Sequence, residues 1–228
     1  MANSYKRIDA HLSSLGYCTR GEAKKFLRIF EVLVKDKRIF DPSLKAYHDD
    51  IKIDKEPIDA ETITILLNKP SGFICSHNDA GSLIYSLIPQ RWNRRNPKIS
   101  TVGRLDVDTT GAIILTDNGD LNHKLTSPKS DVIKVYEATL AEPLKGDETQ
   151  IFASGELMLN GEKKPLLPAT LEVINPTLVR LEICEGKYHQ VKRMFAAVGN
   201  RVLTLHRVSF DGFTVEDLKE GEYKFIEL

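Results

Sequence analysis

The sequence has few cysteines and no long apolar run, and each shortage excludes a class of protein. Its 228 residues include three cysteines, Cys18, Cys75 and Cys184, which are widely spaced and form no C-x-x-C pair. This spacing is unlike a disulfide framework or a zinc knuckle, so we expect reduced thiols in a cytoplasmic protein. No apolar run approaches the ~20 residues that a membrane span needs. The start, MANSYKRIDA, lacks the apolar stretch of a signal peptide.

The chain also has no net charge, with 32 basic and 32 acidic residues. This balance argues against a protein that coats nucleic acid indiscriminately. The charge is uneven, however, because the first forty residues hold nine lysines and arginines against four acidic residues. The hydrophobic share of 41% is typical of a globular protein, with room for one large domain or a small domain plus a larger one.

Residues 1–57 have the pattern of a small basic domain. Apolar residues at helical spacing over 8–16 predict one helix, ending at a glycine. Thr19 and Glu22 predict the capping box of a second helix, with an apolar stripe over 23–30. The basic side chains on the other faces of the second helix are Arg20, Lys24, Lys25 and Arg28. Such a helix is typical either of RNA binding or of an ordinary solvated surface.

A composition shift at Glu56-Pro57 predicts a second, larger domain over residues 61–228. Its strand-like segments are TITILLNKPSGFICS, GAIILTD, VYEATL, TLEVI, LVRLEIC and VLTLHRVSF. Residues 81–96 look helical, and the helix HQVKRMFAAVG ends at Gly199. We therefore expect an α+β fold: a small N-terminal α/β domain and a larger domain with a mostly antiparallel or mixed central sheet and flanking helices.

The run GRLDVDTTG at residues 103–111 carries two carboxylates, Asp106 and Asp108, which would point to one face of an extended segment. Taken alone, the run allows three interpretations. A calcium loop would use Asp117 at its twelfth position, although the flanking helices of an EF-hand are missing from the pattern. A D-x-D magnesium site would lack a phosphate-binding loop nearby. The third interpretation is an Asp-rich turn that closes a hairpin.

Four motifs in order resemble the RsuA family of pseudouridine synthases, which contains the ribosomal small-subunit enzyme and its large-subunit relatives. GRLDVDTTG resembles the family signature, and LLNKPSGFICS resembles its first motif. KVYEATL resembles its tyrosine-bearing strand, and EGKYHQVKRMFAAVGNRVLTLHR resembles its third motif. The basic N-terminal segment resembles the S4-like RNA-binding domain that precedes the catalytic domain in this family. The resemblance covers nearly the whole chain and implies a pseudouridine synthase.

The resemblance also implies residue roles. Asp106 matches the catalytic aspartate, and Arg104 matches the arginine that helps to hold the target nucleotide out of its helix. Tyr136 matches the tyrosine that stacks on the target base, and Leu205 falls at an apolar pocket position. Lys192 matches the basic residue that pairs with the aspartate, where many relatives carry arginine. Lysine offers a point charge rather than a planar fork.

The implied reaction explains why these residue types suffice. Isomerising uridine breaks the bond from C1′ to N1 and forms one from C1′ to C5, so no redox step occurs and we expect no cofactor and no metal. An ionised carboxylate acts either as a nucleophile at C1′ or by removing the 2′ proton, and the sequence leaves both routes open. His189 and His206 have no partner at metal-ligand spacing, so we interpret them as RNA-contacting or structural.

The target is indicated by DVDTTG together with LTSPKSD, which look closest to the small-subunit enzyme. We therefore expect a specific uridine in 16S rRNA, or in a small-subunit assembly intermediate, as the substrate of a monomeric protein without membrane association. A 23S rRNA site is one alternative, and a non-catalytic rRNA-binding chaperone is another. A metal-dependent nuclease or phosphotransferase is a third and would require magnesium in its chemical step.

Overall fold

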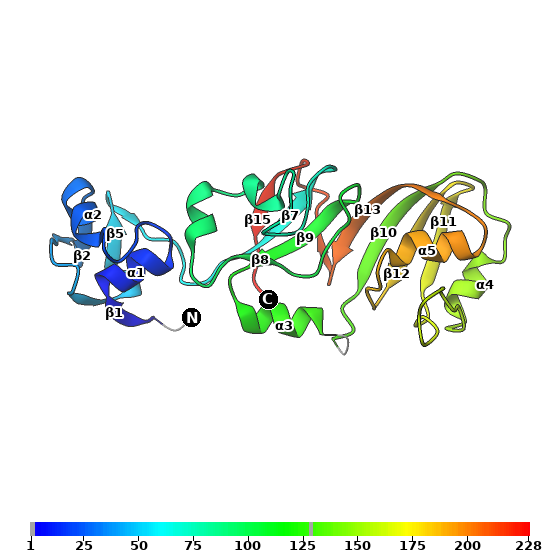
Figure 1. Cartoon of the computed structure of the whole chain (residues 1–228), viewed down its shortest axis with the longest axis horizontal. Helices are drawn as coiled ribbons and strands as arrows, with labels where there is room; N and C mark the ends of the chain where they lie inside the picture. The colour runs from blue at the N-terminus through cyan, green and yellow to red at the C-terminus, as the bar shows by residue number, and fades with distance from the viewer. Residues whose placement is uncertain (1–2, 128–129) are drawn as a thin grey trace. The chain divides into compact units, whose positions relative to one another are not determined.

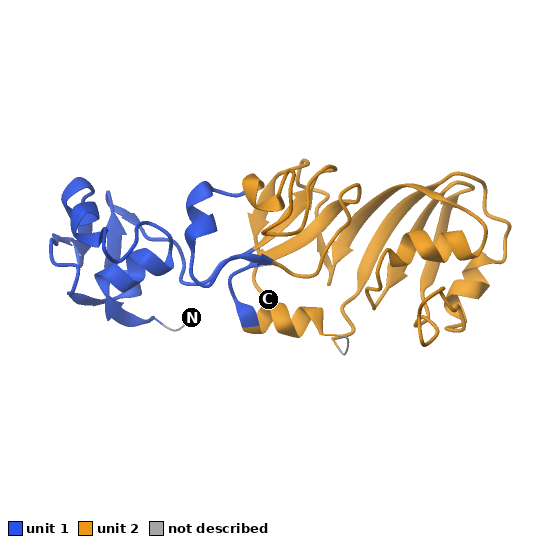
Figure 2. Ribbon diagram, in the orientation of Figure 1, with its two compact units in different colours: residues 1–64, 88–100, 116–119 blue, residues 65–87, 101–115, 120–228 orange. Residues whose placement is uncertain are grey.

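The computed structural model describes residues 3–127 and 130–228. The chain forms two compact units (Figure 2). The first consists of residues 1–64, 88–100 and 116–119, and the second of residues 65–87, 101–115 and 120–228. Among the described residues, no helix is both long and apolar enough to cross a membrane.

The first unit is built from two short helices and small sheets (Figure 1). The helices are α1 (Ile8–Ser14) and α2 (Ala23–Ile29), and a single 3-10 turn, η1 (His48–Asp50), precedes β5. Strands β3 (Lys37–Arg38), β2 (Val32–Val34), β5 (Ile51–Ile53) and β6 (Glu56–Pro57) form an antiparallel sheet in that order, while β1 (Tyr5–Arg7) pairs with β4 (Lys45–Tyr47). The buried core comprises Ile8, Leu12, Leu15, Leu27, Val32, Ala46, Ile51 and Ile58.

The helix end predicted at Gly16 and the capping box predicted at Thr19 and Glu22 are both present in this unit. Gly16 has a φ of +78°, the left-handed conformation that ends many helices. The Glu22 carboxylate accepts hydrogen bonds from the Thr19 amide (2.9 Å) and hydroxyl (2.7 Å), and the Glu22 amide donates to Thr19 Oγ1 (3.3 Å). These are the reciprocal contacts of a capping box. Helix α2 begins only at Ala23, because residues 20–22 form a turn.

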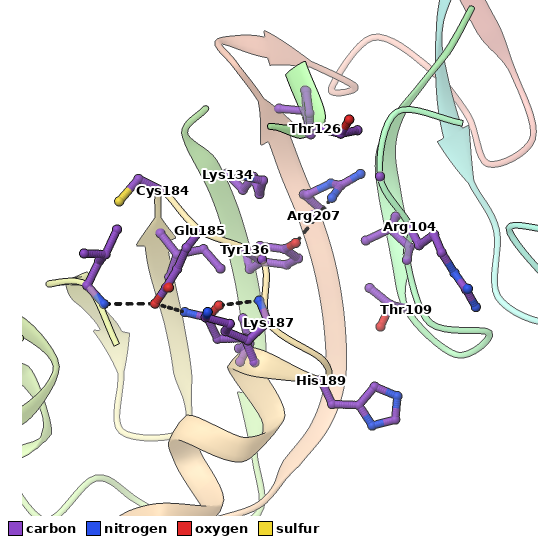
Figure 3. A pocket seen from close by; sticks show the side chains of 18 of the residues that line it. Arg104, Thr109, Thr126, Lys134, Tyr136, Cys184, Glu185, Lys187, His189 and Arg207 are labelled. Atoms are coloured by element: carbon purple, nitrogen blue, oxygen red, sulfur yellow. Dashed lines mark hydrogen bonds between the residues drawn. The ribbon is translucent and has the colours of Figure 1, made fainter. Parts of the chain in front are cut away.

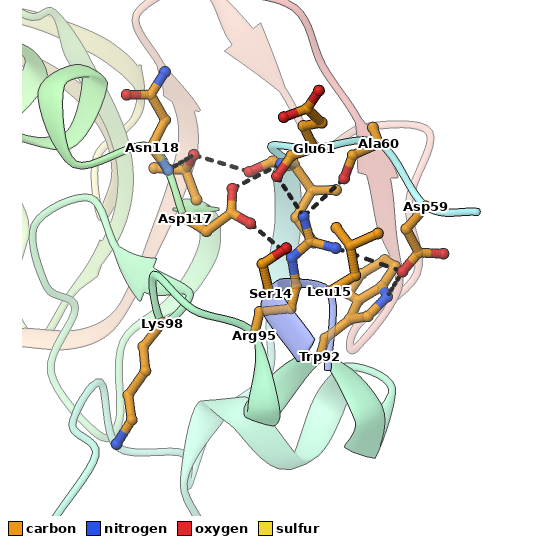
Figure 4. Close-up of polar contacts among 12 residues, drawn as sticks. Ser14, Leu15, Asp59, Ala60, Glu61, Trp92, Arg95, Lys98, Asp117 and Asn118 are labelled. Carbon is orange, nitrogen blue, oxygen red and sulfur yellow. Dashed lines mark hydrogen bonds and ion pairs between the residues drawn. The ribbon is translucent and has the colours of Figure 1, made fainter. Parts of the chain in front are cut away.

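A buried arginine joins the three chain segments of the first unit (Figure 4). The Arg95 side chain is 1% exposed, and its Nε donates to Asp117 Oδ2 at 2.6 Å. Its Nη2 donates to the carbonyls of residues 60 and 61. Asp59 accepts from both terminal nitrogens of Arg91, at 2.7 and 3.0 Å. Because a buried charge is costly unless it is paired, this network fixes how the segments pack.

Residues 81–96 correct one of the sequence predictions, since the structure has no α-helix there. The segment forms two 3-10 turns, η2 (Ile84–Leu87) and η3 (Gln90–Arg94). Pro89 separates the turns and Pro97 follows the second. A proline lacks the amide that continues a helix and disfavours the helical conformation of the residue before it. The segment is therefore limited to single turns.

The second unit is organised around a mixed nine-stranded sheet, which confirms the α+β prediction. The strand order is β11-β12-β10-β13-β9-β7-β15, with β14 paired to β13 and β8 paired to β9. The strands are β7 (Thr64–Lys69), β8 (Ser100–Thr101), β9 (Thr110–Thr116), β10 (Lys134–Leu140), β11 (Thr170–Asn175), β12 (Leu178–Ile183), β13 (Val202–Phe210), β14 (Phe213–Thr214) and β15 (Tyr223–Phe225). Neighbours β10, β12 and β13 are antiparallel, whereas β13 and β9 are parallel.

Three helices flank this sheet: α3 (Gly119–Thr126), α4 (Glu148–Ala153) and α5 (Gln190–Ala197). Figure 1 shows α4 and α5 beside the β10–β12–β11 part of the sheet. Helix α5 was expected from the sequence, and Gly199 just after it has a φ of +79°. The sequence did not predict α3 and α4, which have eight and six residues.

Candidate active site

The second unit contains a cavity of about 590 Å³ that gathers most of the residues singled out in the sequence. Its lining comes from the loop between β8 and β9, from β10 and β13, and from the turn before α5. Arg104, Asp106, Tyr136 and Leu205 all line it. Figure 3 shows part of this lining, with Tyr136 projecting from β10 and His189 from the turn before α5. Residues more than 80 positions apart in the sequence therefore line the same cavity.

The Asp106 carboxylate lies between two basic side chains. Its Oδ1 is 3.2 Å from His189 Nε2, and its Oδ2 is 3.2 Å from Lys192 Nζ. Lys192 also contacts Asp108 Oδ1 at 2.7 Å. Although burial disfavours the ammonium ion, its hydrogen bonds to Asp108 and Asp106 raise the pKa of Lys192 above its ordinary value. The lysine therefore stays charged and links the two carboxylates of the loop.

A fully buried lysine holds the loop that carries Asp106. Lys69 is 0% exposed, and its Nζ donates to the carbonyls of Asp106 (3.1 Å), Val107 (3.2 Å) and Thr109 (2.8 Å). Burial lowers the pKa of Lys69. The hydrogen bonds of the Lys69 ammonium group are thus accepted by main-chain carbonyls rather than by a carboxylate. The sequence analysis included Lys69 only within a strand-like segment and a family motif, because nothing local indicates that its side chain reaches residues 106–109.

His189 contributes a contact that sequence reasoning missed, since it was interpreted as RNA-contacting or structural. It has left-handed backbone angles (φ 48°, ψ 35°) immediately before α5, and its ring stacks on Tyr188 with centroids 3.8 Å apart. A non-glycine residue in this conformation is uncommon and is often found at functional sites. Its position three residues before Lys192, near the start of a predicted helix, is the one signal that could have placed both on one face.

Tyr136 and Leu205 form part of the buried wall of the cavity. They are 8% and 7% exposed, and Tyr136 pairs in register with Arg207 across β10 and β13. The Arg207 Nη1 donates to the Tyr136 hydroxyl at 3.3 Å (Figure 3). Arg207, 2% exposed, also lines the cavity but had no role in the sequence analysis. Arg104 lines the same cavity and is exposed.

The remaining sequence candidates lie elsewhere. Arg20, Lys24, Lys25 and Arg28 belong to the first unit and are exposed. His206 Nδ1 is 2.8 Å from Thr110 Oγ1, which links β13 to β9, and burial lowers the pKa of His206. Within the LTSPKSD run, Pro128 and Lys129 lie outside the described residues.

The calcium-loop interpretation is inconsistent with the local structure, because residues 110–116 form strand β9 instead of a loop. Asp117, at the proposed twelfth position, is paired with Arg95. Among residues 3–127 and 130–228, no cluster of three or more His, Cys, Asp or Glu side chains has the arrangement of a metal site. The structure instead places the Asp106 carboxylate between His189 and Lys192, beside a cavity that Tyr136 lines.

The second unit is thus an α+β domain with a mixed sheet and a carboxylate-bearing loop beside a cavity. The family model described as RNA pseudouridylate synthase matches residues 63–197, and the chain belongs to that family. Membership makes the chain a pseudouridine synthase, an isomerase that converts uridine to pseudouridine. This confirms the class of enzyme that the four motifs implied.

Several relatives are similar over much of the chain. The ribosomal small subunit pseudouridine synthase A of Escherichia coli K12 is 48% identical over 163 residues, which are 70% of this chain and 68% of that protein. The protein of the same name from Pasteurella multocida is 41% identical over 96% of this chain and 94% of its own length. A crystal structure of a pseudouridylate synthase superposes with a TM-score of 0.68 at 38% identity, covering 97% of this chain and 96% of that one.

Proposed function

We propose that this protein isomerises a specific uridine of 16S-type small-subunit ribosomal RNA to pseudouridine, without a cofactor. The observation that carries the proposal is the Asp106 carboxylate, held between His189 and Lys192 beside the cavity. The choice of RNA is supported by relatives that are about 40% identical along nearly the whole chain and are named ribosomal small subunit pseudouridine synthase A. The expected site of action is the cytoplasm, where ribosomes assemble.

Asp106 is the proposed catalytic residue, acting at C1′ or on the 2′ proton of the target uridine. Lys192 and His189 lie within ion-pair distance of its carboxylate and are placed to orient it. Tyr136 is proposed to stack on the uracil, which must turn over between detachment and reattachment. Leu205 would pack against the same base, and Arg104 would help to keep the nucleotide out of its helix at an unstacking cost of a few kcal/mol.

The N-terminal segment, residues 1–57, is the proposed S4-like RNA-binding domain, and residues 61–228 the proposed catalytic domain. Arg20, Lys24, Lys25 and Arg28 are exposed on or beside α2, where they can contact RNA phosphates. We propose that the protein acts as a monomer on this RNA.

The test is tritium release from C5-labelled uridine in small-subunit ribosomal RNA. Formation of the C1′–C5 bond expels the C5 hydrogen, so the wild-type protein should release tritium and Asp106→Asn should not. Retained RNA binding by Asp106→Asn shows that the variant is folded. Release from large-subunit RNA instead would contradict the proposed target. Equal release by both proteins would contradict the assignment of Asp106.

A further inference from the structure

Lys134 and Arg207 are two further basic side chains that line the same cavity. Lys134 lies at the start of β10, and Arg207 lies near the middle of β13 (Figure 3). The Lys134 Nζ and the Arg207 Cζ are 5.8 and 5.0 Å from the centre of the Phe210 ring, so both face one aromatic side chain. Arg207 Cζ is also 5.8 Å from the centre of the Tyr136 ring.

Within the parts of the chain that the structure describes, neither cation has a carboxylate partner at ion-pair distance. Arg207 donates through Nε to the Ala112 carbonyl (2.6 Å) and through Nη1 to the Tyr136 hydroxyl, whereas its buried Nη2 has no hydrogen-bond partner. Lys134 donates to the Val132 carbonyl at 2.6 Å. Burial and, next, the charge of Arg207 lower the pKa of Lys134.

A buried arginine and a half-buried lysine with no carboxylate partner are costly to a folded protein, and such groups cluster where a ligand brings the opposite charge. The group they would receive is therefore an anion or a strong acceptor. Only a part of the RNA that enters the cavity can reach these side chains, because Arg207 is 2% exposed and Tyr136 is 8% exposed. A phosphate remains in the RNA backbone, whereas the flipped base projects furthest from it.

We propose that Arg207 and Lys134 form a subsite for the uracil ring and stabilise the negative charge that the ring carries once it has detached from the ribose. The inference rests on the proposed function, because it concerns the leaving group of that reaction. A base stacked on Tyr136 would place a carbonyl edge near the Arg207 guanidinium, which contacts the tyrosine hydroxyl. The unpartnered Nη2 is the donor available to that edge.

The chemistry requires such a stabiliser. When the C1′–N1 bond breaks, its electron pair stays on N1, and the charge spreads to the O2 and O4 carbonyl oxygens of uracil. Asp106 answers the electron deficiency at C1′ by bonding to it or by removing the 2′ proton. The anion then attacks C1′ through C5, which displaces the Asp106 carboxylate in the first route and is accompanied by return of the proton from Asp106 to C2′ in the second. The C5 proton leaves and N1 takes up a proton, so atoms and electrons balance. Donors fixed where charge develops typically contribute about 100-fold or more to the rate.

The first test compares RNA fragments that carry uridine or 5-fluorouridine at the target position. Lys134→Gln is the main variant, Lys134→Arg retains the charge, and Lys219→Gln is the matched control at an exposed lysine outside the cavity. Arg207→Lys is a second variant, although Arg207 also bonds to β9 and its folding must be checked by thermal melting. The readouts are the single-turnover rate of C1′–N1 cleavage and the Kd for RNA.

We expect Lys134→Gln to slow cleavage of uridine roughly 100-fold while the Kd changes less than about threefold. With 5-fluorouridine the loss should shrink to about tenfold, because fluorine already stabilises the uracil anion. Equal losses with both nucleotides would overturn the proposal. A rise in Kd that accounts for the whole loss would also overturn it and would indicate a phosphate contact.

A second measurement does not depend on the RNA target. Free 5-fluorouracil changes its ultraviolet absorbance on ionising, and the subsite should shift that ionisation to lower pH in the presence of wild-type protein but not of Lys134→Gln. No shift with the wild-type protein would overturn the proposed subsite. A shift in a protein that converts no small-subunit uridine would support the subsite and reject the proposed target instead.

Discussion

At the scale of single residues, the charge around Asp106 depends on one basic side chain, Lys192. Lys192 contacts both Asp106 and Asp108, and the hydrogen bond from this lysine holds the pKa of Asp108 below its usual range. Two carboxylates in one short loop would otherwise repel each other. The single positive charge of the lysine therefore offsets part of the negative charge of the two carboxylates.

We predict that Lys192→Gln lowers the single-turnover rate of pseudouridine formation by roughly 100-fold, because the amide cannot offset the carboxylate charge. Lys192→Arg should retain most of the activity, since a guanidinium supplies the same charge from a planar fork. Tritium release from C5-labelled RNA measures both. An equally large loss in Lys192→Arg would indicate that the lysine acts through its shape rather than its charge.

At the scale of elements, the loop between β8 and β9 depends on a lysine from β7. Lys69 donates to the carbonyls of Asp106, Val107 and Thr109, and the first two also accept from the backbone amides of Thr109 and Gly72. Unpaired buried carbonyls cost free energy, so the loop conformation follows from the position of β7 in the sheet.

We predict that Lys69→Met lowers the free energy of unfolding by about 1–3 kcal/mol, because it leaves the buried Thr109 carbonyl without its lysine donor. Lys219→Met, the same change at an exposed lysine, should have an effect below about 0.5 kcal/mol. Urea denaturation measures both variants. A wild-type-like stability of Lys69→Met would show that solvent replaces the lysine.

The parallel contact between β9 and β13 depends on a glycine. Gly111 has a φ of +103°, and a Cβ placed there would lie 2.2 Å from the Arg207 carbonyl oxygen. Gly146 has a similar φ of +112°, but a Cβ there would meet nothing within 4 Å. Substitution of Gly146 therefore tests the positive φ alone, whereas substitution of Gly111 tests the positive φ together with the close approach of β13.

We predict that Gly146→Ala lowers the free energy of unfolding by about 1 kcal/mol through backbone strain alone. Gly111→Ala should cost roughly 3 kcal/mol or more, since β13 must also move away. It should reduce activity as well, because the shift displaces Arg207 and Leu205. Equal destabilisation by the two substitutions would contradict the close approach.

At the scale of the whole molecule, the charge is balanced overall but concentrated locally. The net charge is +0, yet the basic residues Arg20, Lys24, Lys25 and Arg28 are exposed together on the first unit. Contacts from such residues to phosphates release counterions, which makes RNA binding dependent on salt.

We predict that replacing these four residues with glutamine weakens RNA binding for every sequence tested. The slope of log K against log salt should become shallower by up to about 3, since each lost contact with a single-stranded phosphate removes about 0.7. Lys219→Gln together with Lys224→Gln is the control and should leave the slope unchanged. An unchanged slope in the fourfold variant would mean that RNA is bound through another surface.

The sequence by itself determined the features that depend on neighbours along the chain. The capping contact of Thr19 with Glu22, the strands β9 and β10 and the helix α5 follow from spacing and composition. The α+β class follows from the succession of strand-like and helical segments, and the order of the four motifs gave the family resemblance that the family model confirms. The helix expected over 81–96 was wrong, because Pro89 lies between two 3-10 turns and interrupts the segment.

Only the tertiary structure decided which side chains meet in the cavity. Lys69 reaches residues 106–109 because β7 and β9 are neighbours, and Arg207 reaches Tyr136 because β13 pairs with β10. Sheet order places residues together that are 37 to 71 positions apart, and a linear pattern carries no information on that order. The buried cations are found in the same way, because burial is a property of packing rather than of any residue alone.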